Sequence, residues 1–326
     1  MATHSTLEMA APSLAERSPT GRPKFSDPLW TATGERRASV VPGALRTLWF
    51  NTGTLCNLAC SGCYIESSPR NDRLVYLSRD EVGRFLLEAA ADHPDIAEVG
   101  FTGGEPFMNP EIMGMLADAL EANFRVLVLT NAMRPLHHHR RDLLSLCRRY
   151  LDRLCLRVSL DHYSPEGHEQ VRGPQSFTPA IEGLKWLSDH DFDIAVAARL
   201  VGREDAAELR DGFSRLFIRE GIAIDAFDPH RLVLFPEMDE KAEVPEITER
   251  CWTILHKSPA DLMCASARMV IKRRDAAEPV VVACTLLPYD PRFEMGRTLG
   301  EAMTRVHLNH PHCAKFCVLG GASCSA

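Results

Sequence analysis

The sequence predicts an α/β protein, organised as a partial (β/α)6 barrel that is followed by a small cysteine-rich hairpin-plus-helix extension. Three observations support this fold class. Six short β-rich runs alternate with amphipathic helical stretches, the alternation stops near residue 245, and residues 246–326 hold six of the 11 cysteines. Alternation of strands and helices implies right-handed crossovers and therefore a parallel sheet.

The barrel elements are read from the periodicity of apolar residues. The β-rich runs fall at 45–51, 98–102, 125–130, 153–160, 193–200 and 231–235. Amphipathic helical patterns lie near 79–92, 110–122, 138–150, 176–190 and 205–219. Six strands fit an open or partial barrel better than a closed barrel of eight. Ligands bind at the carboxyl ends of parallel strands, so residues that directly follow a strand are the strongest site candidates.

We expect three segments along the chain. Residues 1–43 are rich in Ser, Thr, Pro, Ala and Arg without apolar periodicity, which predicts a disordered or loosely packed segment. Residues 44–245 form the barrel, and residues 246–326 form the cysteine-rich unit. Within that unit we expect a helix over 246–257, a hairpin of 269–272 and 280–284, and a helical piece near 298–308.

Composition excludes several classes of protein. The 37 Lys and Arg against 44 Asp and Glu give a net charge of −7, which argues against a nucleic-acid partner. The sequence has neither an apolar run long enough to span a membrane nor the apolar core of a secretory signal, so we expect a cytoplasmic protein without membrane contact. In that reducing compartment, many cysteines indicate metal or cluster ligation rather than disulfides.

The first group of cysteines directly follows the first predicted strand. Cys56, Cys60 and Cys63 form the pattern C-x3-C-x2-C within the segment LCNLACSGCY. Thiolates are soft ligands suited to zinc or iron–sulfur clusters. Three ligands without a local fourth leave one metal position open, which is useful for catalysis. The alternatives are three buried structural cysteines or part of a zinc site.

Further motifs follow the next strands. Residues 101–106 read FTGGEP, Thr130 and Asn131 end the third strand, and residues 159–161 read SLD at the end of the fourth. In this order the motifs resemble the radical S-adenosylmethionine (radical SAM) superfamily. The resemblance covers residues 44 to 235 and implies a 4Fe–4S cluster on the three cysteines. It also implies that the amine and carboxylate of S-adenosylmethionine chelate the fourth iron.

The resemblance also implies cofactor-binding residues. Gly103 and Gly104 pair with the methionine moiety, Glu105 accepts from its amine, and Ser159 binds its carboxylate or the ribose. Asn131 matches the family's Thr-Asn-Gly motif, although Ala132 replaces the glycine. Two further candidates are weaker. Tyr64 departs from the family pattern, because it follows rather than precedes the third cysteine, and it either stacks on the adenine or packs in the core. Arg199 is a candidate by its position alone, and it pairs with a carboxylate of cofactor or substrate or forms a structural ion pair.

The second group of cysteines lies in the C-terminal unit. Cys264 precedes the expected hairpin, Cys284 ends it, and Cys313 and Cys317 form C-x3-C near the end of the chain. This arrangement resembles the SPASM-type extension in its short form, the twitch domain, and implies a second 4Fe–4S cluster. Close pairs in that family are usually C-x2-C, and Cys324 could replace one of the four ligands. Zinc on the same ligands, or a single structural site, is the alternative.

These features predict a radical SAM enzyme, an oxidoreductase in the first interpretation. It would cleave S-adenosylmethionine reductively and use the 5′-deoxyadenosyl radical to oxidise or rearrange a small molecule, with the auxiliary cluster as electron acceptor or substrate ligand. A flavodoxin- or ferredoxin-type protein would supply the electron. The alternatives are a maturase that modifies a ribosomally made peptide and, from another class, a non-catalytic iron–sulfur or zinc scaffold. The intact GGEP motif argues against the scaffold.

Overall fold

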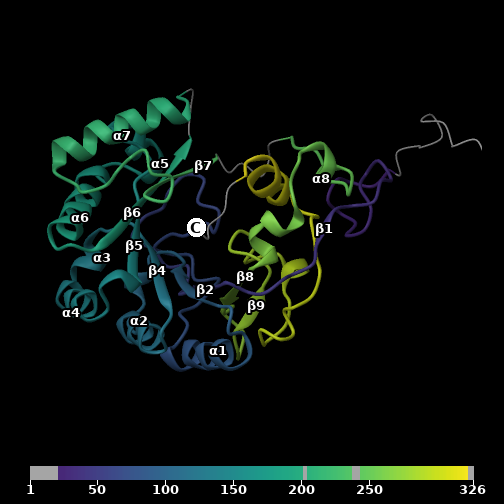
Figure 1. Ribbon diagram of the computed structural model, residues 1–326, viewed down its shortest axis with the longest axis horizontal. Coiled ribbons are helices and arrows are strands. Elements are labelled where there is room, and N and C mark those ends of the chain that lie inside the picture. The colour runs from purple at the N-terminus through teal and green to yellow at the C-terminus, as the bar shows by residue number, and fades with distance from the viewer. Residues whose placement is uncertain (1–20, 201–203, 237–242, 322–326) are drawn as a thin grey trace, which may run out of the picture.

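A single curved sheet forms the frame of the molecule in the computed structural model, which describes residues 21–200, 204–236 and 243–321. Its strand order is β7-β6-β5-β4-β3-β2-β8-β9. The strands β2 to β7 pair in parallel, each beside its neighbour in the chain, and helices cover the outer side of the sheet (Figure 1). This sequential parallel order confirms the partial barrel. The six strands are β2 (Thr47–Asn51), β3 (Glu98–Thr102), β4 (Arg125–Thr130), β5 (Leu154–Ser159), β6 (Asp193–Leu200) and β7 (Leu232–Pro236).

The long helices lie where the apolar periodicity predicts them. Two carry capping boxes that fix their starts, Ser78 with Glu81 and Asp205 with Glu208. Two shorter helices, α3 (Arg134–His137) and α5 (Pro165–Arg172), were not predicted. They follow β4 and β5 and therefore lie at the site end of the barrel. The long helices are α1 (Arg79–Asp92), α2 (Ile112–Glu121), α4 (Arg140–Tyr150), α6 (Phe177–Asp189) and α7 (Ala206–Glu220).

The predicted hairpin continues the barrel sheet. Strand β8 (Ala267–Ile271) pairs in parallel with β2, and β9 (Val280–Val282) returns antiparallel to β8. Trp49 of β2 and Met269 of β8 are buried in one apolar cluster with the cysteine-rich unit. The division at residue 245 stays a prediction, because the sheet runs from one unit into the other.

Two helices expected in the C-terminal unit differ from the structure. The helix predicted over 246–257 is only α8 (Cys251–Ile254), and residues 298–308 form turns and then β10 (Val306–His307). The physical reason in the second segment is a distant acceptor: Glu88 of α1 accepts from the backbone N–H groups of Leu299 and Gly300. Beyond β10 the chain forms a π-helical stretch, Cys313–Leu319.

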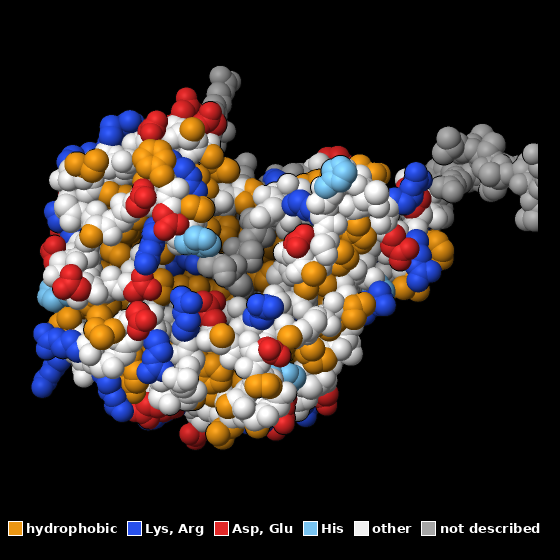
Figure 2. All heavy atoms as spheres, in the orientation of Figure 1, with side chains coloured by type: hydrophobic (Ala, Val, Ile, Leu, Met, Phe, Trp, Pro, Cys, Tyr) orange, Lys and Arg blue, Asp and Glu red, His pale blue; other side chains and the backbone are white. Residues whose placement is uncertain are grey.

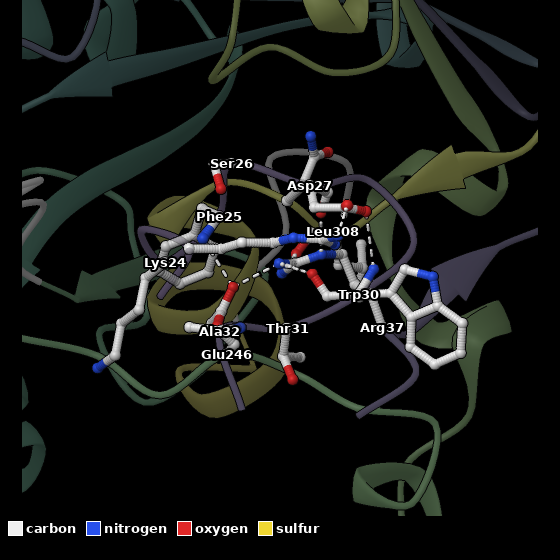
Figure 3. A network of polar contacts seen from close by, with 12 residues as sticks. Lys24, Phe25, Ser26, Asp27, Trp30, Thr31, Ala32, Arg37, Glu246 and Leu308 are labelled. Carbon is white, nitrogen blue, oxygen red and sulfur yellow. Dashed lines mark hydrogen bonds and ion pairs between the residues drawn. The ribbon is translucent and has the colours of Figure 1, made fainter. Parts of the chain in front are cut away.

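Residues 21–43 pack against the C-terminal unit, which corrects the expectation of a loosely packed segment; residues 1–20 lie outside the described residues. Strand β1 (Ser39–Val40) pairs antiparallel with β10. The Arg37 guanidinium is fully buried in an ion pair with Glu246, whose carboxylate also accepts from backbone N–H groups of Phe25 and Ala32, each at 2.6 Å (Figure 3). The partners are more than 200 positions apart, so no local pattern predicts this packing.

Candidate active site

The loop after β2 carries the first three cysteines to the carboxyl ends of the strands. Cys56 is buried, whereas Cys60 and Cys63 are partly exposed, and all three line one cavity. The backbone N–H of Cys56 donates to Ser68 O at 3.1 Å, which closes the loop on itself. Burial raises the pKa of the Cys56 thiol to about 12. A buried thiolate is unfavourable without a cation, so bound metal would stabilise the ionised form.

The cavity gathers residues from the ends of several strands. Most of the predicted cofactor-binding residues lie on its wall, and apolar side chains form another part of it. On the face shown in Figure 2, acidic and basic side chains are interspersed around the barrel. The predicted residues on the wall are Tyr64, Gly103, Gly104, Asn131, Ser159 and Arg199.

Gly103 and Gly104 allow two loops to touch. The N–H of Gly104 donates to Gly53 O at 2.8 Å, and the N–H of Glu105 donates to Leu55 O at 3.1 Å. A Cβ on Gly104 would lie 2.1 Å from Leu55 O, and Gly103 has φ +141°. The two glycines therefore fix the cysteine loop against β3, in addition to lining the cavity.

Glu105 is the one predicted cofactor-binding residue that does not line the described cavity. Its carboxylate is 2% exposed and is not on the cavity wall. It accepts from the Asn131 backbone N–H at 2.8 Å, the Thr130 hydroxyl at 2.9 Å and the Phe107 N–H at 3.2 Å. Burial raises its pKa to about 7. These contacts hold the ends of β3 and β4 together, and a contact of Glu105 with the cofactor amine stays a prediction.

Asn131 links β4 to the cysteine loop. Its side-chain amide donates to Asn57 Oδ1 at 2.8 Å and lies 3.9 Å from Cys56 Sγ. Ala132, which stands in place of the family's glycine, has φ +56°. That is the left-handed region which favours glycine, so the backbone keeps the shape expected of the motif.

A buried cluster of charges follows β5. Asp161 accepts from Arg172 Nε at 2.6 Å and from Arg199 Nε at 2.8 Å, and these two cations hold the pKa of the carboxyl well below its usual range. Arg199 also donates to Gly62 O at 3.1 Å in the cysteine loop. Arg172 was not expected from the sequence, and it lies at the end of the unpredicted helix α5. Its charge lowers the pKa of the Cys60 thiol, against the larger effect of burial.

The second four cysteines also meet. Cys264, Cys284, Cys313 and Cys317 all line a small apolar cavity in the C-terminal unit. Burial raises the pKa of Cys264 to about 11 and that of Cys313 well above its usual value. Cys324 lies outside the described residues.

The two cavities share a wall. Leu286 lines both of them. Phe316 lines the first cavity, whereas its helical neighbours Cys313 and Cys317 line the second. Phe316 also stacks on Phe235 of β7, with ring centroids 5.7 Å apart. The C-terminal unit therefore contributes directly to the cavity of the barrel.

Comparison with known proteins gives a consistent picture. A profile of the Radical SAM superfamily matches residues 50–211. The chain is 27% identical over 197 residues to the antilisterial bacteriocin subtilosin biosynthesis protein AlbA of Bacillus subtilis, covering 56% of this chain and 40% of AlbA. It is 28% identical over 169 residues to the mycofactocin maturase MftC of Mycolicibacterium smegmatis, covering 52% and 41%. It is also 32% identical over 132 residues to a GTP 3′,8-cyclase of Streptomyces coelicolor, covering 40% and 37%. The matches thus span about two fifths of these relatives.

Solved structures share the fold. anSMEcpe with bound AdoMet superimposes with a TM-score of 0.58 at 14% identity, covering 79% of this chain and 77% of that one. SuiB of Streptococcus suis, bound to S-adenosylmethionine, has a TM-score of 0.56 at 12% identity, covering 78% and 63%. None of the helices in the described part of the chain has the length and apolar character of a membrane span.

Proposed function

Because the chain belongs to the radical SAM superfamily, we propose that it is an enzyme that cleaves S-adenosylmethionine in the cavity at the carboxyl ends of its strands and modifies a second substrate there. Members of the superfamily use a 4Fe–4S cluster and S-adenosylmethionine. When bound, the cluster supplies one electron to the sulfonium, and the released 5′-deoxyadenosyl radical takes a hydrogen atom from the substrate.

The residues around the cavity fit both cofactors. Cys56, Cys60 and Cys63 supply three thiolates, and the described cavity wall contains no fourth cysteine, which leaves one metal position for S-adenosylmethionine. Arg172 and Ser159, both on the wall, would hold the cofactor carboxylate. Arg199 would hold the cysteine loop in place for the cofactor, because it also donates to the Gly62 carbonyl.

Cofactor cleavage is the direct test of this function. We expect the reconstituted, dithionite-reduced protein to form 5′-deoxyadenosine and methionine without oxygen. Cys60→Ala should abolish this activity, because two thiolates hold the cluster poorly. Cys147→Ala is the matched control, since this thiol lies on helix α4 away from both cavities. Cleavage at the wild-type rate in Cys60→Ala would overturn the proposal, and absence of cleavage in the wild type would favour a scaffold.

The observation that supports a second cluster is the convergence of four cysteines on one apolar cavity. Four thiolates complete the ligand set of a 4Fe–4S cluster. We expect about eight irons per chain, and about four after the double change Cys313→Ala and Cys317→Ala. That variant should still cleave S-adenosylmethionine. Zinc in place of iron at this site would contradict the auxiliary cluster.

A peptide is the substrate that the relatives and the cavity favour. AlbA and MftC are by name a bacteriocin biosynthesis protein and a maturase. The cavity wall includes the apolar side chains of Leu129, Phe235 and Phe316, which suit an apolar peptide side chain.

A small-molecule substrate, which the sequence alone favoured, becomes the second candidate, and the 32% identity over 132 residues to the GTP 3′,8-cyclase supports it. Coexpression of the chain with short peptides encoded beside its gene, followed by peptide mass spectrometry, separates the two. A mass change that requires Cys60 supports the peptide. Stimulation of cofactor cleavage by GTP, without any peptide change, would favour the small molecule. A flavodoxin- or ferredoxin-type protein stays the predicted electron donor.

A further inference from the structure

Arg268 is a buried cation beside the second group of cysteines. It lies on β8 and is 0% exposed. Its Nη1 donates to Cys264 O and Ala267 O, both at 2.7 Å, and its Nε donates to Ala302 O at 2.9 Å. The buried Nη2 has no hydrogen-bond partner, and no Asp or Glu in the described ranges forms an ion pair with this arginine.

Two other arginines that are largely withdrawn from solvent in the described chain have carboxylate partners. Arg37 pairs with Glu246, and Arg172 pairs with Asp161. Taking a guanidinium out of water without an anion is costly, because backbone carbonyls neutralise none of its charge. Burial lowers the pKa of Arg268, and the groups that act in the opposite direction are Cys264 and Cys284. The contact of its Nη1 with the Cys264 carbonyl places this cation beside the second group of cysteines, whose thiolates are therefore the anions that can compensate it.

We propose that Arg268 is the counter-cation of the auxiliary cluster and raises its reduction potential. This inference rests on the cluster proposed above. A 4Fe–4S cluster on four thiolates has a net negative charge, which grows by one unit when it accepts one electron. A fixed cation stabilises the reduced form more than the oxidised form and thus makes the cluster a better acceptor. During turnover the electron would come from the substrate radical, which is oxidised and releases a proton.

The test measures the auxiliary cluster alone in the full-length chain. Cys56, Cys60 and Cys63 are changed to Ala, and the reduction potential is determined by dithionite titration monitored by electron paramagnetic resonance. Arg268→Gln removes the charge but keeps a donor for the carbonyls. Arg268→Lys keeps the charge. Arg274→Gln is the matched control, because this arginine lies on the same hairpin but is exposed and paired with Asp72.

We expect Arg268→Gln to shift the potential to more negative values, while Arg268→Lys and Arg274→Gln leave it near that of the parent. An unchanged potential in Arg268→Gln, or an equal shift in Arg274→Gln, would overturn the proposal. If Arg268→Gln loses its iron, retention of iron by Arg268→Lys supports the role of the charge, whereas loss in both shows a purely structural role.

Failure of the proposed cluster itself has a different signature. In that case the parent with Ala at positions 56, 60 and 63 binds no redox-active iron, and the inference about Arg268 is overturned together with the cluster. Cleavage of S-adenosylmethionine by the wild type would then still support the first site, since it depends only on Cys56, Cys60 and Cys63.

Discussion

Gly104 shows how a single hydrogen atom in place of a side chain decides the geometry of the site. A Cβ there would lie 2.1 Å from Leu55 O, and backbone oxygen cannot move without moving the cysteine loop. We expect Gly104→Ala to lower cofactor cleavage about 100-fold, because displacement of reacting groups by about 1 Å costs that much. Gly83→Ala is the control: a Cβ there meets nothing within 4 Å, and Ala in helix α1 should stabilise by up to about 1 kcal/mol. Equal activities of both variants would refute the packing role.

His168 predicts a pH dependence of stability. Its side chain is 0% exposed, its Nδ1 accepts from the Asp161 N–H at 3.2 Å, and burial lowers its pKa to about 4 from the usual 6.5. Between these values the unfolded chain binds the additional proton, so the stability from His168 is lost as the pH falls. Its share of the free energy of unfolding should decrease by about 2 kcal/mol from pH 7.5 to pH 5.

The measurement compares thermal unfolding of the wild type and His168→Gln across this range. Glu105 acts in the opposite direction, because its raised pKa gives stability that is lost as the pH rises. Only the difference between the two proteins therefore isolates His168. The variant should lose less stability on acidification, and parallel pH profiles would exclude the histidine as the cause.

At the level of elements, the sequence predicted the helices that are determined by residues close together in the chain. The helix predicted over 79–92 coincides with α1, whose apolar face and capping box are both readable in the sequence. The helix predicted over 298–308 does not form, because the backbone N–H groups of Leu299 and Gly300 donate to Glu88, which is more than 200 positions away. The packing of residues 21–43 was not predicted for the same reason. Arg37 pairs with Glu246 and β1 pairs with β10, and both partners are more than 200 positions away.

The Arg37–Glu246 pair predicts that the N-terminal segment stabilises the cysteine-rich unit. Both side chains are at most 5% exposed, and Arg37 also donates to Leu308 O at 3.2 Å, close to Cys313 in the chain. Glu246→Gln leaves a buried cation unpaired, which typically costs about 3–5 kcal/mol. We expect faster proteolysis after residue 245 and less iron in the C-terminal unit.

The exposed pair of Arg36 and Glu249 is the matched control, with side chains 71% and 52% exposed. Such surface pairs contribute about 0–1 kcal/mol, so Glu249→Gln should change proteolysis little. If Glu249→Gln and Glu246→Gln were equally sensitive to proteolysis, burial of the Arg37–Glu246 pair would not be what holds residues 21–43 in place.

For the molecule as a whole, the order of motifs along the barrel predicted that these residues would meet at one cavity. Cysteines, GGEP and SLD each follow a strand, and parallel strands bring their carboxyl ends to one edge. Arg172 could not be predicted in this way, since it lies on a short helix beyond the strand end. Its ion pair with Asp161 holds it at the cavity wall. The shared wall of the two cavities could not be predicted either, because it depends on how the C-terminal unit packs against the barrel.

Tyr289 couples this docked unit to the first group of cysteines. Its hydroxyl donates to Ile65 O at 2.8 Å and accepts from Asn71 Nδ2 at 3.2 Å, and the Arg73 guanidinium lies 3.6 Å from its ring centroid. Ile65 follows Cys63 by two positions, and Tyr289 follows Cys284 by five. One side chain thus links the loops that carry a ligand of each proposed cluster.

Tyr289→Phe removes the hydrogen bonds and keeps the ring. A hydrogen bond of this kind contributes about 0.5–1.5 kcal/mol, so a loop that orders less well should lower single-turnover cofactor cleavage about 2- to 10-fold. The iron content should stay unchanged, because the four auxiliary cysteines are untouched. Tyr150→Phe is the control, since the buried Tyr150 hydroxyl has no hydrogen-bond partner among the described residues and its loss should be neutral. If the two Phe variants cleave the cofactor at the same rate, the two units act independently, and contact between them serves only to close the barrel.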